Sequence, residues 1–176
     1  VDSNFIADTT VDTTAPVLTA ANVTLSDVEA DGVSGTVAPG DEIRVEATGV
    51  QDATSDVETV VVDTGAFGAG TVELTDQGGG TYAATITVGS TGSVTEGSQD
   101  VKLTATDTAS PANAVSVRTG TVEIDDTPPA VGTATATVDG GGPVGDGDEI
   151  TVAVTGVSDA TGVQRVEADL SAFGAG

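Results

Sequence analysis

The sequence predicts an all-β protein built from two-sheet β-sandwiches in tandem, one complete and one partial. Val and Thr are abundant, and only 2% of the 176 residues are aromatic, a composition that favours strands over helices. Apolar residues alternate with polar ones over several stretches, which is the two-residue period of half-buried strands. Short sequences also return after about 110 residues, which indicates an internal repeat.

Seven segments of the first copy show this alternation, separated by turn residues such as the Gly run at 78–80. We expect strands at residues 17–25, 43–48, 57–62, 71–75, 81–88, 101–105 and 115–124. In the second segment, Ile43, Val45 and Ala47 face the core. The residues expected on the core face of the fifth and sixth segments are Tyr82, Ala84, Ile86, Val88, Val101, Leu103 and Ala105. In the last segment the inward positions change parity across Gly120, which predicts a β-bulge there.

Three stretches of the first copy share a recognisable pattern: "GGTYAATITV" at 79–88, "VKLTATDTASPANAV" at 101–115 and "TGTVEIDDTPPAV" at 119–131. They resemble the immunoglobulin-like repeats of bacterial and archaeal surface proteins. The resemblance implies a strand E after a turn, a strand F with an Asp-containing FG loop, and a strand G that runs into a linker. Seven short strands suit the same fold, although the Cys and Trp of antibody domains are absent. We therefore expect tandem immunoglobulin-like β-sandwiches.

The repeat defines the expected domain boundaries. "GDEI" at 40–43 returns at 147–150 with an offset of 107, and "AFGAG" at 66–70 returns at 172–176 with an offset of 106. We expect the last strand of a preceding domain, or an extended arm, in residues 1–11. A complete sandwich follows in 12–125, and the first strands (A to C) of a second domain follow in 126–176.

The second domain lacks sequence for strands D to G, so it cannot close a sandwich by itself. Continuation of the chain, or strands from a neighbouring molecule, would complete it, and continuation is the favoured interpretation. Phe67 and Phe173 are two of only three phenylalanines, and they occupy the same place in the loop between strands C and D. We expect each to plug the end of its sandwich.

The charge of the chain excludes several classes of partner. There are 28 acidic and 4 basic residues, giving a formal net charge of −24. Nucleic acids and anionic membranes are bound through clustered Lys and Arg, so neither is expected to bind. Acidic residues spread over the whole length, with a single Lys, are typical of extreme halophiles, whose salt screens the repulsion.

The absence of His and Cys removes the usual nucleophile–base pairs of enzymes, so we expect no catalytic activity. Calcium is the candidate cofactor, because it binds about six to eight oxygen ligands and Asp-rich turns supply them. At the end where the entry linker meets the BC and FG loops, the candidate ligands are Asp12, Asp52, Asp56 and Asp107. At the exit linker, near the next domain, they are Asp41, Glu42, Asp125, Asp126 and Asp159. The alternative is that these acidic loops are solvated surface.

The leading hypothesis is a structural segment of an extracellular surface filament, stalk or surface-layer protein of a halophilic archaeon. Its partners would be further immunoglobulin-like domains of the same or neighbouring chains. Asn22-Val23-Thr24 is a sequon, so Asn22 is a candidate glycosylation site on such a protein. Two alternatives are an adhesin spacer, whose tip binds cell-surface glycans, and a fibre or decoration protein of a halophilic virus.

Overall fold

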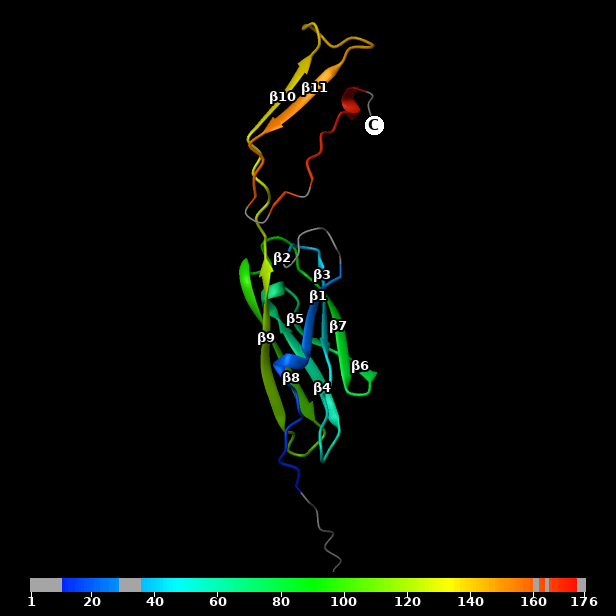
Figure 1. The fold of residues 1–176 in the computed structure, drawn as a ribbon, viewed down its shortest axis with the longest axis vertical. Helices are drawn as coiled ribbons and strands as arrows, with labels where there is room; N and C mark the ends of the chain where they lie inside the picture. Colours follow the sequence, from blue (N-terminus) through cyan, green and yellow to red (C-terminus); the bar gives the residue numbers. More distant parts are fainter. Residues whose placement is uncertain (1–10, 29–35, 160–161, 164, 174–176) are drawn as a thin grey trace, which may run out of the picture. The chain divides into compact units, whose positions relative to one another are not determined.

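The described part of the chain is all-β. The computed structural model describes residues 11–28, 36–159, 162–163 and 165–173, and Figure 1 shows their order along the chain. These residues form eleven β-strands and three short 3-10 turns, with no α-helix among them. Their contacts divide them into unit 1, which ends at Asp126, and unit 2, which begins at Thr127.

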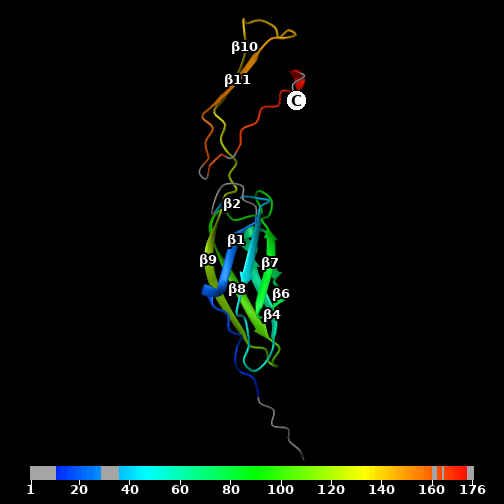
Figure 2. The same ribbon diagram turned by 45° about the vertical axis from the view of Figure 1, so that its right-hand side comes forward.

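Unit 1 contains two sheets, whose strands run alongside one another in both views (Figures 1 and 2). The first has the order β1 (Val23–Asp27), β3 (Glu42–Ala47), β7 (Thr81–Thr87) and β6 (Thr75–Gly78). The second has the order β2 (Thr36–Val37), β9 (Ala114–Ile124), β8 (Gly97–Asp107), β4 (Val57–Thr64) and β5 (Gly70–Glu73). β2 pairs with β9 in parallel, and the other pairs are antiparallel.

The inner faces of the two sheets share one hydrophobic core. Side chains from β3 and β7 and from β4, β8 and β9 belong to a single buried cluster. The core-facing positions predicted from alternation are confirmed, with Tyr82 and Ala84 half-buried and these residues fully buried: Ile43, Val45, Ala47, Ile86, Val88, Val101, Leu103 and Ala105. Two sheets around one core are compatible with a β-sandwich, and the prediction of an all-β protein is confirmed.

The single strand expected at residues 71–75 is wrong, because this segment contributes to both sheets. β5 pairs with β4 in the second sheet, whereas β6 pairs with β7 in the first. Leu74 lies between them, fully buried, and its N–H donates to the Val60 carbonyl at 2.8 Å. The buried Leu74 anchors the chain where it passes from one sheet to the other. Alternation of apolar residues does not show this change, because it does not reveal which strand supplies the hydrogen bonds.

The bulge predicted at Gly120 is confirmed. Asp100 pairs with Thr121, and Lys102 pairs with Arg118. One residue of β8 therefore lies opposite two residues of β9, and Gly120 is one of the two. The extra residue restores the core-facing parity, so that Val122 and Ile124 are buried.

Unit 2 repeats the local pairing of unit 1. Its strands β10 (Thr133–Val138) and β11 (Ile150–Thr155) form an antiparallel hairpin, seen in Figures 1 and 2. The bridge between Val17 and Gln51 in unit 1 recurs between Ala130 and Ser158 in unit 2. Residues 51 and 158 differ by the sequence offset of 107. The repeat in the sequence is therefore also a repeat in structure.

The third strand expected in the second copy is not formed by residues 162–163 and 165–170. The equivalent strand of unit 1, β4, is held by hydrogen bonds to β5 and β8 on its two sides. No such neighbours occur among the described residues of unit 2, so nothing pairs with this segment there. The 3-10 turn is nevertheless kept: η2 (Gly65–Phe67) in unit 1 corresponds to η3 (Ser171–Phe173) in unit 2. Across the described ranges, no helix has the length and apolarity needed to cross a bilayer.

Candidate metal centre

Three aspartates from distant parts of the chain meet at one end of unit 1. Asp12 lies in the segment before the first bridge, Asp52 lies between β3 and β4, and Asp107 is the last residue of β8. One carboxylate oxygen from each lies within 4.8 Å of the other two. The sequence predicted that these three residues converge, and the structure brings them together.

Backbone pairing explains why the first two segments meet. The Val17 N–H donates to the Gln51 carbonyl at 2.7 Å, which places the entry segment beside the loop that contains Asp52. Asn113 then links this segment to the loop after β8. Its side-chain amide donates to the Asp12 carbonyl at 3.3 Å and to Asp107 Oδ2 at 2.8 Å. One amide therefore ties the entry segment to the β8–β9 loop.

Asp107 is the most enclosed member of the group, with none of its surface exposed. Its Oδ1 accepts hydrogen bonds from the backbone N–H groups of Asn113 at 2.7 Å and Ala109 at 3.1 Å. These donors compensate the desolvation of a buried carboxylate and fix its orientation. Each carboxylate oxygen can accept more than one bond, so Asp107 retains acceptor capacity toward the other two aspartates.

Asp12 and Asp52 are oriented by turns in their own segments. Asp12 Oδ1 accepts the Thr14 N–H at 2.9 Å. Asp52 Oδ1 accepts the N–H groups of Thr54 at 2.8 Å and Ser55 at 2.9 Å, and the Thr54 hydroxyl at 3.2 Å. In each case one oxygen is committed to the turn, which leaves Oδ2 to point elsewhere.

The remaining oxygens are buried and unbonded. Oδ2 of Asp12, Oδ2 of Asp52 and the hydroxyl oxygen of Ser55 make no hydrogen bond of normal geometry within the described residues, although the Thr54 and Ser55 hydroxyls lie near enough to the Asp12 carboxylate to lower its pKa. Buried polar atoms are nearly always paired, so three such atoms at one place require an explanation. A cation supplies one, because carboxylate and hydroxyl oxygens are the ligands that hard cations bind.

The surroundings of Asp12 and Asp52 keep these two carboxylates ionised. The pKa of Asp12 lies below its ordinary value of 3.8, chiefly because of the Thr54 hydroxyl and then the Thr14 amide. The backbone amides of Thr54 and Ser55 lower the pKa of Asp52, while the neighbouring charge of Asp12 acts in the opposite direction. Hydrogen bonds that favour the anion thus outweigh the repulsion between these two carboxylates, and Asp12 and Asp52 are charged at neutral pH.

Asp56, the fourth residue expected here, does not join the group. Its side chain is exposed, and its backbone pairs with Thr108, whose N–H donates to the Asp56 carbonyl at 2.9 Å. Its negative charge instead acts on Tyr82, whose pKa is raised by burial and then by Asp76 and Asp56. Asp56 is therefore not part of the three-aspartate group.

The second expected group is not formed by its members in unit 1. Within residues 11–28 and 36–126, the carboxylates of Asp41, Glu42, Asp125 and Asp126 are not gathered as those of Asp12, Asp52 and Asp107 are. Two of them serve local turns instead: Asp41 accepts the Ala38 N–H at 2.7 Å, and Asp126 accepts the Gly92 N–H at 2.8 Å. Asp159, the fifth member, belongs to unit 2, where its Oδ1 accepts the Gly162 N–H at 3.2 Å.

A scan against family models and searches of curated proteins and solved structures found no match. Asn113 and Ser55 were not predicted from the sequence as members of this end of unit 1. The only signal for Asn113 is its position six residues after Asp107 in the same loop, and that spacing is too common to single it out.

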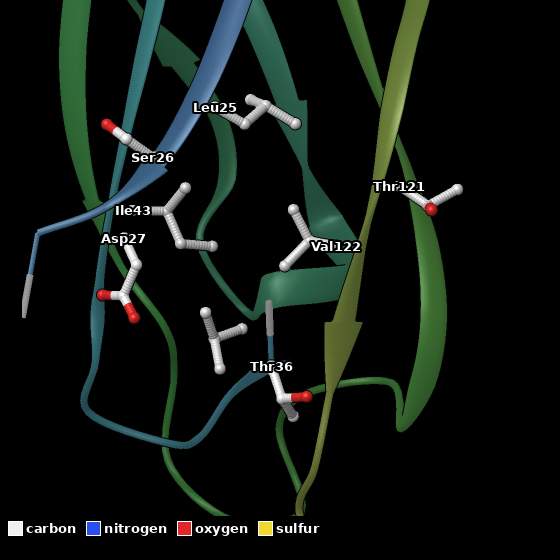
Figure 3. Close-up of a pocket in the computed structure, with 8 residues that line it drawn as sticks. Leu25, Ser26, Asp27, Thr36, Ile43, Thr121 and Val122 are labelled. Carbon is white, nitrogen blue, oxygen red and sulfur yellow. The ribbon is translucent and has the colours of Figure 1, made fainter. Parts of the chain in front are cut away.

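Two other features lie away from these aspartates. Asn22 is exposed in the 3-10 turn η1 (Ala20–Asn22) that precedes β1, and Thr24 of its sequon is exposed as well. A groove of about 300 Å³ lies between the sheets, with Leu25 and Ile43 on one side and Val122 on the other (Figure 3). Of the residues lining it, Asp27 alone carries a carboxylate, so the groove offers no pair of acid and base groups.

Proposed function

We propose that this chain is a structural segment of an extracellular surface filament, stalk or surface-layer protein built from tandem immunoglobulin-like domains. The strand order supports this: β1-β3-β7-β6 facing β2-β9-β8-β4-β5 corresponds to strands A-B-E-D facing A′-G-F-C-C′. The repeated pairing in unit 2 carries the proposal furthest. A chain that repeats one sandwich pattern in series suits a role in spanning distance.

The charge distribution supports a halophilic source. Three Arg–carboxylate pairs occur among the described residues, Arg44–Glu46, Arg118–Asp100 and Arg165–Glu167, and all are solvent-exposed. Exposed pairs of this kind contribute little to stability, so they do not offset a net charge of −24. Screening by concentrated salt removes most of that repulsion. We propose a halophilic archaeon as the source on this basis.

A calcium ion held by Asp12, Asp52 and Asp107 would strengthen such a segment. Asp12 lies in the segment that enters unit 1, whereas Asp52 and Asp107 lie in loops of the sandwich. A cation bound to all three would join the entry segment to the body of the unit. The buried, unbonded oxygens of Asp12, Asp52 and Ser55 are the observation that supports it.

Immunogold electron microscopy of intact source cells tests the proposed role. Antibodies raised against residues 11–126 should label filaments, stalks or a surface layer on unpermeabilised cells. Label confined to the cytoplasm of sectioned cells would overturn the proposal. Label on released virus particles alone would point to the viral alternative instead.

A further inference from the structure

The hairpin of unit 2 has one apolar and one polar face. In the β10–β11 register, Ala134 pairs with Val154, Ala136 with Val152, and Val138 with Ile150. Directly paired residues lie on the same side of a sheet, so these six side chains share a face. The opposite face is formed by Thr133, Thr135, Thr137, Thr151, Ala153 and Thr155. Such a division is expected of a hairpin that covers a hydrophobic core.

In unit 1 the equivalent face is buried. β11 corresponds to β3 by the offset of 107, so Val152 occupies the position of Val45 and Val154 that of Ala47. Val45 is 1% exposed, whereas Val152 is 37% exposed. Their strand partners are equivalent too, because Leu25 pairs with Val45 as Ala136 pairs with Val152. The equivalent face thus occurs in both units, but among the described residues it is buried only in unit 1.

The two phenylalanines differ in the same way. Phe67 is 2% exposed in η2, and Phe173 is 55% exposed in η3. In unit 1 the segment between β7 and β8 covers this turn. The Gly89 N–H donates to the Phe67 carbonyl and the Thr95 N–H to the Ala66 carbonyl, both at 2.8 Å. The cover of Phe67 therefore comes from sequence that has no counterpart in residues 127–173.

We propose that the apolar face of the β10–β11 hairpin, with Phe173, is an acceptor surface for a segment that repeats the strand pattern of residues 71–126. Unit 1 identifies the occupant, because there β8 and β9, which lie within residues 71–126, share the buried cluster with the equivalent face, and the β7–β8 connection covers the equivalent turn. The occupant supplies alternating Val, Leu, Ile and Ala side chains to the hairpin and a Gly- and Ser-containing turn to Phe173. This inference rests on the repeat architecture proposed above, but not on calcium binding or on location at the cell surface.

A chain extended by its own repeat provides the test. Residue 176 corresponds to residue 70 by the offset of 106, so a copy of residues 71–126 joined after residue 176 continues the repeat in register. The chain has no cysteine, so single cysteines report exposure through their rate of reaction with a thiol reagent. Val152→Cys places the probe on the apolar face, and Thr151→Cys places a matched control on the opposite face.

In the extended chain we expect Val152→Cys to react at least about ten-fold more slowly than in the 176-residue chain, since labelling then requires local opening. Thr151→Cys should react at the same rate in both. Equal rates for Val152→Cys in the two chains would overturn the proposal. So would slowing at both positions, because that pattern indicates aggregation over both faces.

Labelling of Val152→Cys in the 176-residue chain alone distinguishes the remaining occupants of the face. Protection of Val152→Cys that grows with protein concentration would show that a second copy of the hairpin occupies the face, contrary to the proposal. Protection independent of concentration would show that the chain covers the face itself, which also overturns it. Immunogold labelling of cells is independent of all these outcomes, so failure here and failure of the proposed function can be told apart.

Discussion

Unit 1 and unit 2 carry equivalent paired strands, yet among the described residues only unit 1 forms a buried hydrophobic core. Val17 bridges Gln51 and Ala130 bridges Ser158, and in both units the following strands pair antiparallel in equivalent registers. The hairpin pairing is therefore encoded within about 30 contiguous residues, as expected of local β-structure. Burial is not encoded locally. In unit 1 it requires β4 and also β8 and β9, which begin about 50 residues or more after β3 ends.

The largest expected contrast is between the two phenylalanines. Phe67→Ala should lower the free energy of unfolding of unit 1 by about 3–5 kcal/mol, because a fully buried ring is replaced by a cavity. Phe173→Ala should change it by less than about 0.5 kcal/mol, because the ring is more than half exposed. Urea unfolding followed by the fluorescence of Tyr82, the single tyrosine, measures both. Similar losses for the two variants would show that the units are not as different as their burial indicates.

A smaller contrast is expected at the equivalent valines of β3 and β11. Val45→Ala should destabilise unit 1 by about 1.5–3 kcal/mol through lost burial and incomplete repacking. Val152→Ala should leave the same transition unchanged within about 0.5 kcal/mol. Urea denaturation followed by circular dichroism provides the comparison. If Val152→Ala shifted the transition as much as Val45→Ala, the hairpin would share a core with other parts of the chain.

Calcium should stabilise unit 1 selectively. At constant high salt, adding a chelator is expected to lower the melting temperature of unit 1 by about 5–10 °C, as for any ligand that binds only the folded state. Asp52→Asn should abolish this difference by weakening the site. Asp159→Asn, the equivalent change in the second copy, should preserve it. A melting temperature that the chelator leaves unchanged in the unmodified chain would contradict calcium binding.

The sequence predicts features that depend on alternation and spacing, and misses those that depend on partners. Core-facing Val45 and Leu103 follow from the period of two, and the bulge at Gly120 follows from a change of parity within one strand. The division of residues 71–75 does not, because Leu74 and its neighbours alternate without interruption while their hydrogen-bond partners change from β4 to β7. Pairing between strands is a property of two segments, and one segment does not report it.

The candidate site likewise has features that the sequence predicts and features that it misses. The convergence of Asp12, Asp52 and Asp107 follows from which loops share an end of a sandwich, so topology was sufficient to predict it. Asp56 does not join them, and its side chain is exposed, which loop topology alone does not report. The carboxylates expected around Asp41 and Asp126 are not gathered within residues 11–28 and 36–126. Each accepts a nearby backbone N–H, as Asp12 and Asp52 also do, so the separation of the carboxylates rather than these hydrogen bonds distinguishes the two groups.

The smallest expected effect compares the titration of aspartates in the two units. The pKa of Asp12 is lowered chiefly by Thr54, a residue 42 positions away, whereas that of Asp169 in unit 2 is lowered by Ser171, two positions away. The first interaction requires the folded sandwich, but the second requires only a local turn. Unfolding in urea should therefore return the pKa of Asp12 to its ordinary value of 3.8 and leave that of Asp169 nearly unchanged.

The sign of the linked stability follows from the direction of the shift. Because folding lowers the pKa of Asp12, its contribution is fully present above pH 3.8 and is lost as the pH falls through the lower value of the folded state. Carboxyl resonances followed by NMR during acid titration, with chelator present and with and without urea, measure each pKa directly. Asp12→Asn should reduce the loss of stability below pH 3.8, and Asp169→Asn should not. If urea changed the pKa of Asp12 and that of Asp169 equally, Thr54 would not be held beside Asp12. The entry segment would then be attached to unit 1 only when a metal is bound.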